Sequence, residues 1–248
     1  MRAFFLYFSD FISLIGDKKM KFFSYVIDLF YPRLCQACGR AMLTHERVIC
    51  NYCTVQLPKT HFENKENNPI EVIFWGRADI KAAASYYKYI KDGKVQHLIH
   101  QMKYKGFREV GVYVGEVFGK SLAKSPRFKD IDYIIPVPLH KSKLRKRGFN
   151  QSELFARGLA KSMKAEMIDE NLYRKVASST QTKKSRWERY KNVNDIFGIR
   201  DASLFENKKL LLVDDVITTG STIEACASVL NQIDGVEVSV GAMASAAF

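Results

Sequence analysis

The feature that most constrains this chain is an apolar run that ends in two acidic residues and a hydroxyl-rich turn. Leu210–Val213 has the composition of a buried strand, Asp214 and Asp215 follow it, and residues 216–222 read Val-Ile-Thr-Thr-Gly-Ser-Thr. A strand that leads through such a turn into a helix is typical of parallel α/β sheets. Ligands bind beyond the carboxyl ends of strands in these sheets, so this turn is a candidate functional site.

Strands and helices alternate along the chain from about residue 71. Apolar patterns predict strands over residues 82–89, 131–137, 210–213 and 236–240, and helices over residues 94–103, 110–123, 152–163 and 221–232. Such alternation requires right-handed crossover connections. The predicted fold class is therefore α/β, with a mainly parallel sheet flanked by helices.

The turn after Asp215 is suited to a phosphate group. Amide groups at the N-terminus of a helix attract anions, and the hydroxyl side chains of the turn add hydrogen-bond donors. A glycine in the turn lets the backbone approach a ligand without a Cβ. The candidate ligand-binding residues are Val216, Ile217, Thr218, Thr219, Gly220, Ser221 and Thr222.

Asp214 and Asp215 would repel a phosphate, so we expect them to face hydrogen-bond donors. The 2′- and 3′-hydroxyls of a ribose meet this requirement, assisted by a divalent cation. The alternative is an ordinary helix N-cap that follows a core strand, with two exposed acids. Several constrained positions coincide here in a strand–turn–helix context, which favours the ligand site.

This segment resembles the phosphoribosyl pyrophosphate signature of type I phosphoribosyltransferases, and the resemblance covers residues 76–248. It implies a Rossmann-like domain that binds phosphoribosyl pyrophosphate together with Mg²⁺. Asp214 and Asp215 would bind the ribose hydroxyls, and residues 218–222 would hold the 5-phosphate. By this resemblance the two aspartates are assigned to the catalytic site.

A basic run follows the predicted strand 131–137. Five cations lie within residues 141–147, and a helix start is expected near Asn150. A departing pyrophosphate carries several negative charges, so a cation-rich loop at a strand end suits it. The alternative is a solvated basic face. The candidate ligand-binding residues are Lys141, Lys143, Arg145, Arg147, Asn150 and Gln151.

A second basic segment spans residues 178–193 and includes Trp187 and Tyr190. The corresponding segment of type I phosphoribosyltransferases is a flexible hood that closes over the substrate and excludes water. That resemblance assigns catalytic roles to three of its cations. The alternative is an exposed amphipathic helix over residues 184–192 with Trp187 facing the core. The three cations are Lys183, Arg186 and Arg189.

Four motifs together resemble the ComF family. They are Pro-Val-Pro-Leu-His at 136–140, Lys-Arg-Gly-Phe-Asn-Gln at 146–151, Gln-Thr-x-x-Ser-Arg-x-x-Arg at 181–189, and the aspartate turn. The family pairs a small N-terminal zinc-binding segment with a phosphoribosyltransferase domain. The resemblance implies a role in natural competence, the uptake and handling of transforming DNA. It also implies single-stranded DNA and competence-machinery proteins, such as a helicase or recombination mediator, as partners.

Four of the five cysteines form two C-x-x-C pairs, Cys35 with Cys38 and Cys50 with Cys53, separated by 11 residues. Two such pairs can complete a tetrahedral site of four thiolates for a structural zinc ion. The alternatives are two disulfides or a redox pair. A cytoplasmic location disfavours structural disulfides, and a redox C-x-x-C motif would not need a second pair. Cys226 is interpreted as a small buried hydrophobic residue.

The expected organisation of the 248 residues follows from these motifs. Residues 1–19 are an extension or a misassigned start, 20–62 the zinc-binding module, 63–75 a connection and 76–248 the phosphoribosyltransferase domain. The apolar run near the N-terminus is shorter than the roughly 20 residues of a membrane span. We therefore expect a cytoplasmic protein with no membrane span.

Two functions fit the formal net charge of +13, which favours polyanionic or phosphorylated partners. The first is an enzyme that transfers ribose 5-phosphate from phosphoribosyl pyrophosphate to an acceptor that the sequence does not identify. The second is an accessory factor that binds single-stranded DNA on the same scaffold, with little or no turnover. In the second case Trp187 and Tyr190 would stack on bases among the cations.

Overall fold

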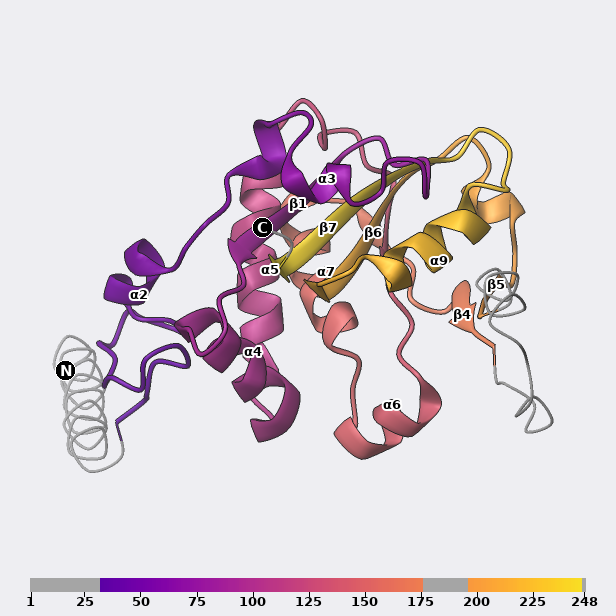
Figure 1. Ribbon diagram of the computed structural model, residues 1–248. Coiled ribbons are helices and arrows are strands. Elements are labelled where there is room, and N and C mark those ends of the chain that lie inside the picture. Colours follow the sequence, from indigo (N-terminus) through magenta and orange to yellow (C-terminus); the bar gives the residue numbers. More distant parts are fainter. Residues whose placement is uncertain (1–31, 176–195, 247–248) are drawn as a thin grey trace, which may run out of the picture. The chain divides into compact units, whose positions relative to one another are not determined.

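The computed structural model describes residues 32–175 and 196–246, which fall into two compact units (Figure 1). The first unit, Met1–Val55, contains four clustered cysteines and most of helix α2 (Asn51–Gln56). The second unit, Gln56–Phe248, contains the sheet. None of the helices in the described part of the chain has the length and apolar character of a membrane span.

A five-stranded parallel sheet forms the centre of the second unit. Its strands lie in the order β1-β7-β6-β2-β3, and every neighbouring pair is parallel. This order requires crossover connections through helices, so the predicted α/β fold class is confirmed. The strands are β1 (Ala83–Lys88), β2 (Tyr133–Pro136), β3 (Glu166–Met167), β6 (Lys209–Ile217) and β7 (Glu237–Ser245).

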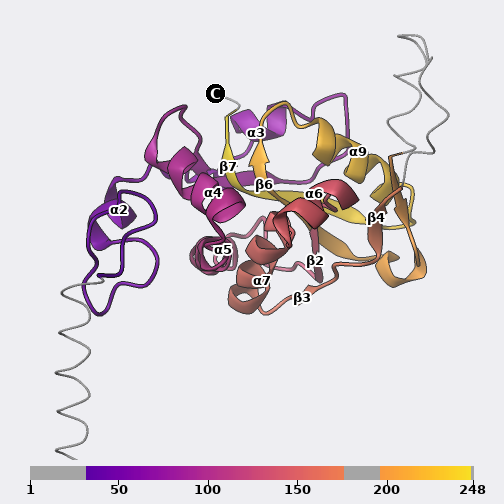
Figure 2. The ribbon, with the colours of Figure 1, turned by 90° about the horizontal axis from the view of Figure 1, so that it is seen from below.

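Helices cover both faces of the sheet. Figure 2 shows α4, α5 and α7 on one face and α3 and α9 on the other. Because both faces are covered, the central strands carry continuous apolar runs instead of alternating patterns. The helices are α3 (Pro69–Val72), α4 (Lys94–Lys105), α5 (Glu109–Leu122), α6 (Lys141–Arg147), α7 (Gln151–Met163) and α9 (Ser221–Leu230), with the short 3-10 helices η1 (Phe62–Asn64) and η3 (Ser203–Phe205).

A separate antiparallel pair of strands lies outside the main sheet. Strand β4 (Leu172–Arg174) pairs with β5 (Phe197–Ile199), and the two strands flank residues 176–195 in the sequence. The sequence analysis predicted neither strand, because three residues are too few to produce a recognisable period. The predicted hood residues 178–193 lie outside the described residues.

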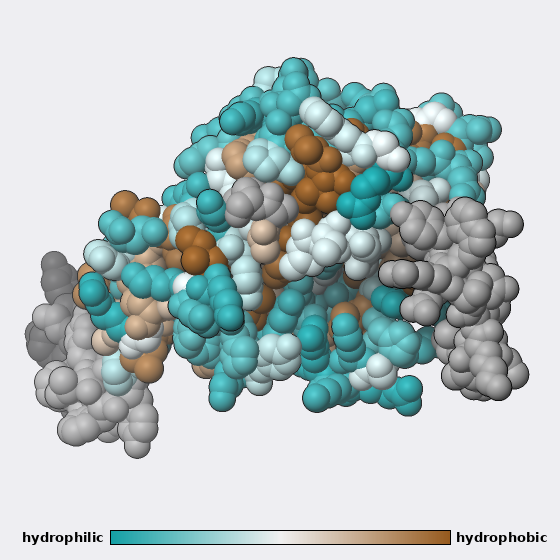
Figure 3. Space-filling view, viewed as in Figure 1, coloured by the Kyte–Doolittle hydropathy of each residue, from teal (hydrophilic) through white to brown (hydrophobic). Residues whose placement is uncertain are grey.

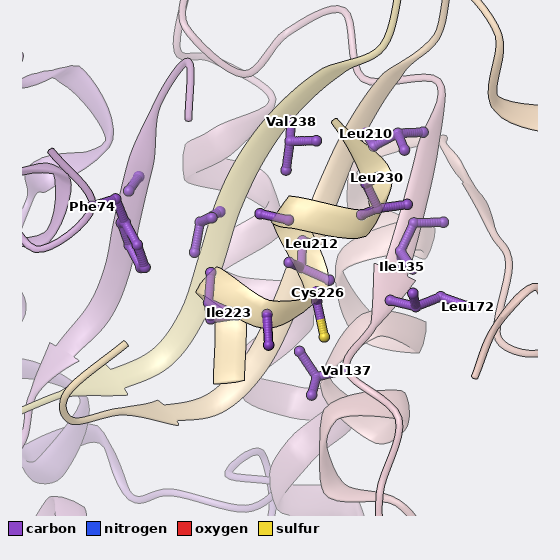
Figure 4. Close-up of a cluster of buried hydrophobic side chains, with 14 of the residues drawn as sticks. Phe74, Ile135, Val137, Leu172, Leu210, Leu212, Ile223, Cys226, Leu230 and Val238 are labelled. Carbon is purple, nitrogen blue, oxygen red and sulfur yellow. The ribbon is translucent and has the colours of Figure 1, made fainter. Parts of the chain in front are cut away.

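One part of the core lies between the sheet and α9. Figure 4 shows apolar side chains from β6, β7 and α9 meeting there. Cys226 is fully buried among them, which confirms its interpretation as a small hydrophobic residue. Fully buried members of this cluster include Ile135, Phe205, Leu210, Leu212, Leu230 and Val240. Their burial holds the start of β6 rigidly in the sheet, and the two aspartates follow in the same strand.

Residues 63–75, which the sequence suggested as a connection, pack against the edge strand β1. Asn68 is fully buried, and its side chain donates a hydrogen bond to the carbonyl oxygen of Ala83 (2.8 Å). The Glu71 carboxylate accepts one from the amide of Ala83 (3.1 Å) and pairs with Arg127 (2.6 Å). These side chains satisfy backbone groups that an edge strand would otherwise leave unpaired. The segment is therefore part of the second unit.

Candidate functional site

The carboxyl end of β2 lies beside the middle of β6, since Pro136 pairs with Val213. A cavity of about 170 Å³ opens beside them. Its walls come from α4, α6, α7, α9, β4 and β6 and from residues 137–140, so segments from residue 103 to residue 222 meet there. Its charged and polar lining includes Lys103, His140, Lys143, Arg147, Gln151, Ser152, Arg174, Asp214, Asp215 and Thr222.

Asp214 and Asp215 both line this cavity, but they lie within β6 and not after its end. The strand continues through Val216 to Ile217, because those residues also pair with β7. The sequence analysis ended the strand at Val213, which is wrong, because the two charged residues interrupt the apolar pattern without interrupting the hydrogen bonds of the sheet. A position inside the strand fixes both carboxylates through the backbone.

Each aspartate is held by a neighbouring element. The Asp214 Oδ1 atom accepts hydrogen bonds from the Ser152 hydroxyl and from the amide of Asp215, both at 2.8 Å. The Asp215 Oδ2 atom lies 2.8 Å from the Lys103 ammonium nitrogen. Ser152 belongs to the first turn of α7, and Lys103 to the last turn of α4.

Burial and the neighbouring charge of Asp215 raise the pKa of Asp214 to about 7. The hydrogen bonds from Ser152 and from the Asp215 amide, and the charge of Lys103, oppose this rise but do not cancel it. A cation or a hydroxyl donor that enters the cavity would favour the charged carboxylate. The site is therefore suited to a ligand that brings such groups to the aspartates.

The turn from Thr218 to Thr222 encloses a second hollow of about 30 Å³, which also reaches Asp214. Gly220 adopts a left-handed conformation (φ 75°) and forms the N-cap of α9. The Thr219 hydroxyl oxygen lies 3.1 Å from that of Ser221, and these side chains are exposed. Helix N-terminal amides and exposed hydroxyls at one turn form a place where a phosphate group can bind.

Arg77 holds this turn from outside, a role that the sequence analysis missed. Its guanidinium donates hydrogen bonds to the carbonyl oxygens of Ile73 and Thr219, both at 3.0 Å. It also pairs with Glu224 in the first turn of α9. Nothing in the sequence around Arg77 indicated this contact, because 142 residues separate it from Thr219.

The basic run after β2 forms helix α6 and not the predicted loop. In a helix, residues three or four positions apart share a face. His140, Lys143 and Arg147 accordingly line the cavity, whereas Lys141 and Arg145 are not among its lining residues within the described chain. Figure 3 shows a mainly hydrophilic surface over α6. The helix therefore divides these cations between two faces, and the ligand-binding roles of Lys141 and Arg145 stay predictions.

Asn150 and Gln151 have different environments. The Asn150 side chain caps α7 by accepting a hydrogen bond from the Ser152 amide (3.2 Å), and it donates one to the carbonyl oxygen of Val137 (3.0 Å). It positions the connection between β2 and α7. Gln151 lines the cavity, and its side-chain oxygen accepts a hydrogen bond from Arg147 (2.7 Å).

The cavity also contains residues that the sequence analysis did not assign to it. Lys103 and Ser152 reach the aspartates from two helices, and Arg174 lines the cavity from β4. The only available signal was the cluster of cations at the end of the predicted helix 94–103, and nothing connected that cluster to β6. The catalytic candidates Lys183, Arg186 and Arg189 lie outside the described residues and stay predictions.

The four cysteines of the first unit form a second candidate site. The sulfur atoms of Cys35, Cys38, Cys50 and Cys53 all lie within 4.8 Å of one another, and none of the described cysteines forms a disulfide. The Cys38 and Cys50 sulfur atoms are 3.8 Å apart. A zinc–sulfur distance of about 2.3 Å gives a tetrahedron with edges of about 3.8 Å. The cluster could therefore hold a metal ion.

Hydrogen bonds also favour a thiolate in this cluster. Burial opposes ionisation of Cys38, but donors from the Arg40 amide and the neighbouring cysteines outweigh it and lower the pKa of Cys38 to about 7. Burial raises the pKa of Cys53, and its hydrogen bonds to Cys38 and Cys50 raise it further. Metal ions bind the thiolate form of cysteine, so the cluster is partly prepared for a cation.

The sequence is similar to known proteins with related domains. The Phosphoribosyl transferase domain family matches residues 146–246. The DNA utilization protein YhgH of Shigella flexneri is 28% identical over 201 residues, which cover 79% of this chain and 83% of that protein. Competence protein ComFC of Bacillus subtilis is 25% identical over 198 residues, which cover 79% of this chain and 71% of that protein. Competence protein F of Haemophilus influenzae is 32% identical over 114 residues, which cover 46% of this chain and 50% of that protein.

Two solved structures are also similar. Adenine phosphoribosyltransferase of Saccharomyces cerevisiae shares 14% identity at a TM-score of 0.36, over 58% of this chain and 71% of that one. The glutamine phosphoribosylpyrophosphate amidotransferase of Bacillus subtilis shares 21% identity at a TM-score of 0.39, over 54% of this chain and 26% of that one.

The parallel sheet, with its aspartate pair and hydroxyl-rich turn, and the matched domain define the class of this protein, which has a type I phosphoribosyltransferase fold. Competence protein F and competence protein ComFC are among its relatives, which supports the resemblance to the ComF family that its motifs indicated. The names of its relatives do not mention zinc, so the zinc-binding segment stays a prediction.

Gly220→Ala is expected to destabilise the protein more than Gly76→Ala. Both glycines have a positive φ, 75° and 69°, so alanine carries a similar backbone strain at either position. A Cβ at Gly220 would lie 2.7 Å from Ile73 Cγ2 and 2.9 Å from Phe74 Cε1, whereas one at Gly76 has open space. The overlap is expected to lower the free energy of unfolding by about a further 1–3 kcal/mol. Urea denaturation of both variants measures the difference, and equal losses would contradict this packing.

Proposed function

We propose that this protein binds phosphoribosyl pyrophosphate with Mg²⁺ in the cavity at the end of β6 and acts in the handling of DNA during natural competence. One observation carries the proposal: the cavity brings two carboxylates, four basic side chains and a hydroxyl-rich turn together at the carboxyl edge of a parallel sheet. A phosphorylated pentose with a pyrophosphate group requires these three kinds of partner. The competence and DNA utilization names of its relatives support the cellular role.

The ligand would extend across both hollows. Its 5-phosphate would bind at the turn from Thr218 to Thr222, with amide and hydroxyl donors around it. Its ribose hydroxyls would donate hydrogen bonds to Asp214 and Asp215. The pyrophosphate would then lie toward Lys143 and Arg147 on α6, where arginine can donate two parallel hydrogen bonds to a phosphate.

The carboxylate pair also suits Mg²⁺, which proteins bind through one or two carboxylates together with substrate phosphates. Asp214 and Asp215 would hold it, since among the described contacts each uses one oxygen for a protein partner. When bound, the ion would neutralise part of the charge on the pyrophosphate. The basic side chains would add electrostatic stabilisation as the bond between C1 and pyrophosphate breaks and ribose 5-phosphate passes to an acceptor.

Asp214→Asn is expected to raise the dissociation constant for phosphoribosyl pyrophosphate about tenfold or more. The variant loses a charged acceptor for a ribose hydroxyl and a ligand for Mg²⁺, and a charge-assisted hydrogen bond contributes about 1.5–3 kcal/mol. Titration calorimetry in the presence of Mg²⁺ measures the change. Asp130→Asn is the matched control, because that aspartate is exposed at a different pocket. Undetectable binding by the wild-type protein would contradict the proposal.

A second candidate function, binding of single-stranded DNA, is favoured by the cations of α6 that do not line the cavity. Lys141, Arg145 and Lys146 are exposed and are absent from the lining among the described residues. They are therefore available to a polyanion while Lys143 and Arg147 serve the cavity. The same helix would thus contribute to two anionic ligands on different faces.

Arg145→Glu combined with Lys146→Glu is expected to weaken binding of a labelled single-stranded oligonucleotide and to flatten its salt dependence. Loss of two phosphate contacts lowers the slope of log K against log salt by about 1.4. Fluorescence anisotropy measures the affinity at several salt concentrations. Lys120→Glu with Lys124→Glu, an equal change of charge on exposed residues, is the control. An unchanged slope, or an equal effect of the control, would contradict a DNA contact at α6.

We further infer that the four cysteines of the first unit bind one structural zinc ion. Four thiolates complete the coordination sphere, so the ion would have no open position for catalysis. The contact distances of the cluster support this assignment. A bound ion would contribute directly to the stability of a unit that is too small to bury a large core.

Elemental analysis is expected to find one zinc ion per chain in gently purified protein. Cys53→Ser should lower this content well below one and make the first unit sensitive to proteolysis, because one of the four ligands is lost. Cys226→Ala should retain the zinc, since Cys226 is buried in the second unit. Substoichiometric zinc in the wild-type protein would contradict the assignment.

A further inference from the structure

Lys103 is the one charged side chain of α4 that lines the cavity, among the described residues. The buried residues Val95, Leu98, Ile99 and Met102 fix the orientation of the helix. Lys103 lies in its last turn with a side chain that is only 19% exposed, and its ammonium nitrogen is 2.8 Å from Asp215 Oδ2. The position of the charge is therefore set by the packing of the helix and by the ion pair.

The ammonium group has hydrogen-bonding capacity beyond this ion pair. It carries three donors, and Asp215 accepts one of them. Lys103 and Asp215 both line the cavity, so a ligand on the aspartates would also meet the lysine. Lys103 therefore places a fixed positive charge beside a carboxylate that could otherwise bind a divalent cation.

The charges of the cavity support such a role. Its lining carries four basic side chains, Lys103, Lys143, Arg147 and Arg174, against the carboxylates of Asp214 and Asp215. The positive charges of these lysines and arginines outnumber the negative charges of the aspartates even when both aspartates are ionised. An anionic ligand can therefore be attracted by the protein alone, without the charge of a divalent ion.

We propose that Lys103 contacts bound phosphoribosyl pyrophosphate and supplies part of the charge neutralisation that Mg²⁺ would otherwise provide. This inference rests on the proposed function and adds a ligand-binding residue to it. The protein then binds phosphoribosyl pyrophosphate with only a weak dependence on Mg²⁺. Loss of the lysine charge makes that dependence strong, because the ion must then replace the missing charge.

The test compares the dissociation constant for phosphoribosyl pyrophosphate in Mg²⁺ with that in EDTA, measured by titration calorimetry. The readout is the ratio of the dissociation constant in EDTA to the dissociation constant in Mg²⁺. For the wild-type protein this ratio is expected to be no more than a few-fold above one. For Lys103→Met the ratio is expected to rise about tenfold or more, which corresponds to the loss of one charge-assisted contact. The readout is binding, so it does not require turnover or knowledge of the acceptor.

Three further variants separate a ligand contact from a structural role. Lys105→Met makes the same change in charge at an exposed position of the same helix and should behave like the wild type. Lys103→Arg retains the charge and should keep a low ratio. Lys103→Gln removes the charge but keeps a donor for Asp215, so it should reproduce the raised ratio even if the methionine variant does not fold. Thermal unfolding establishes that each variant is folded.

Several results would overturn the proposal. One is a Lys103→Gln variant that is folded and has the wild-type ratio, since the lysine would then serve only to hold Asp215. Another is tighter binding by this variant in both buffers, since the lysine would then block the site. Failure of the wild-type protein to bind in either buffer would overturn the proposed function, and this inference with it. Binding by the wild type that requires Mg²⁺ would overturn the inference alone.

Discussion

Two carboxylates on a buried strand must be stabilised by their neighbours, and this requirement organises the site. Asp214 and Asp215 lie in β6, directly after a run of fully buried leucines and valine. A carboxylate removed from water is costly unless it is paired. Ser152 and Lys103 provide the partners. Ser152 comes from α7, which packs on β2 and β6, and Lys103 comes from α4, so the cavity lies where these two helices meet the aspartates of β6.

The site extends beyond the part of the chain that matches the Phosphoribosyl transferase domain, residues 146–246. Lys103 and Lys143 line the cavity from outside that range, and Arg77 holds the turn that encloses the second hollow. Ile73 and Phe74 lie so close to Gly220 that a Cβ there would overlap them, so this segment packs tightly against the turn. The segment before β1 is consequently part of the ligand-binding machinery that we propose, although the matched domain does not include it.

Helix α6 shows how one basic run can serve two anions. A loop of five cations could turn all of them toward a single ligand, but a helix separates them by its period of 3.6 residues. Lys143 and Arg147 therefore face the cavity, while Lys141 and Arg145 are exposed elsewhere. This division joins the two functions proposed for the protein, because a bound phosphoribosyl group and a DNA strand would compete little for the same charges.

The amino-acid sequence alone was enough to predict the parallel α/β sheet, the turn after Asp215 and the grouping of the four cysteines. These features follow from periodicity and short spacings, which act over a few residues. It could not reveal that Lys103 and Ser152 contact the aspartates, that Arg174 lines the same cavity, or which cations of α6 also line it. Those contacts depend on how the crossover connections bring together segments as far apart as residues 103 and 215. Only the packing of helices onto the sheet decides which side chains share a cavity, because no local pattern records the distance between remote residues.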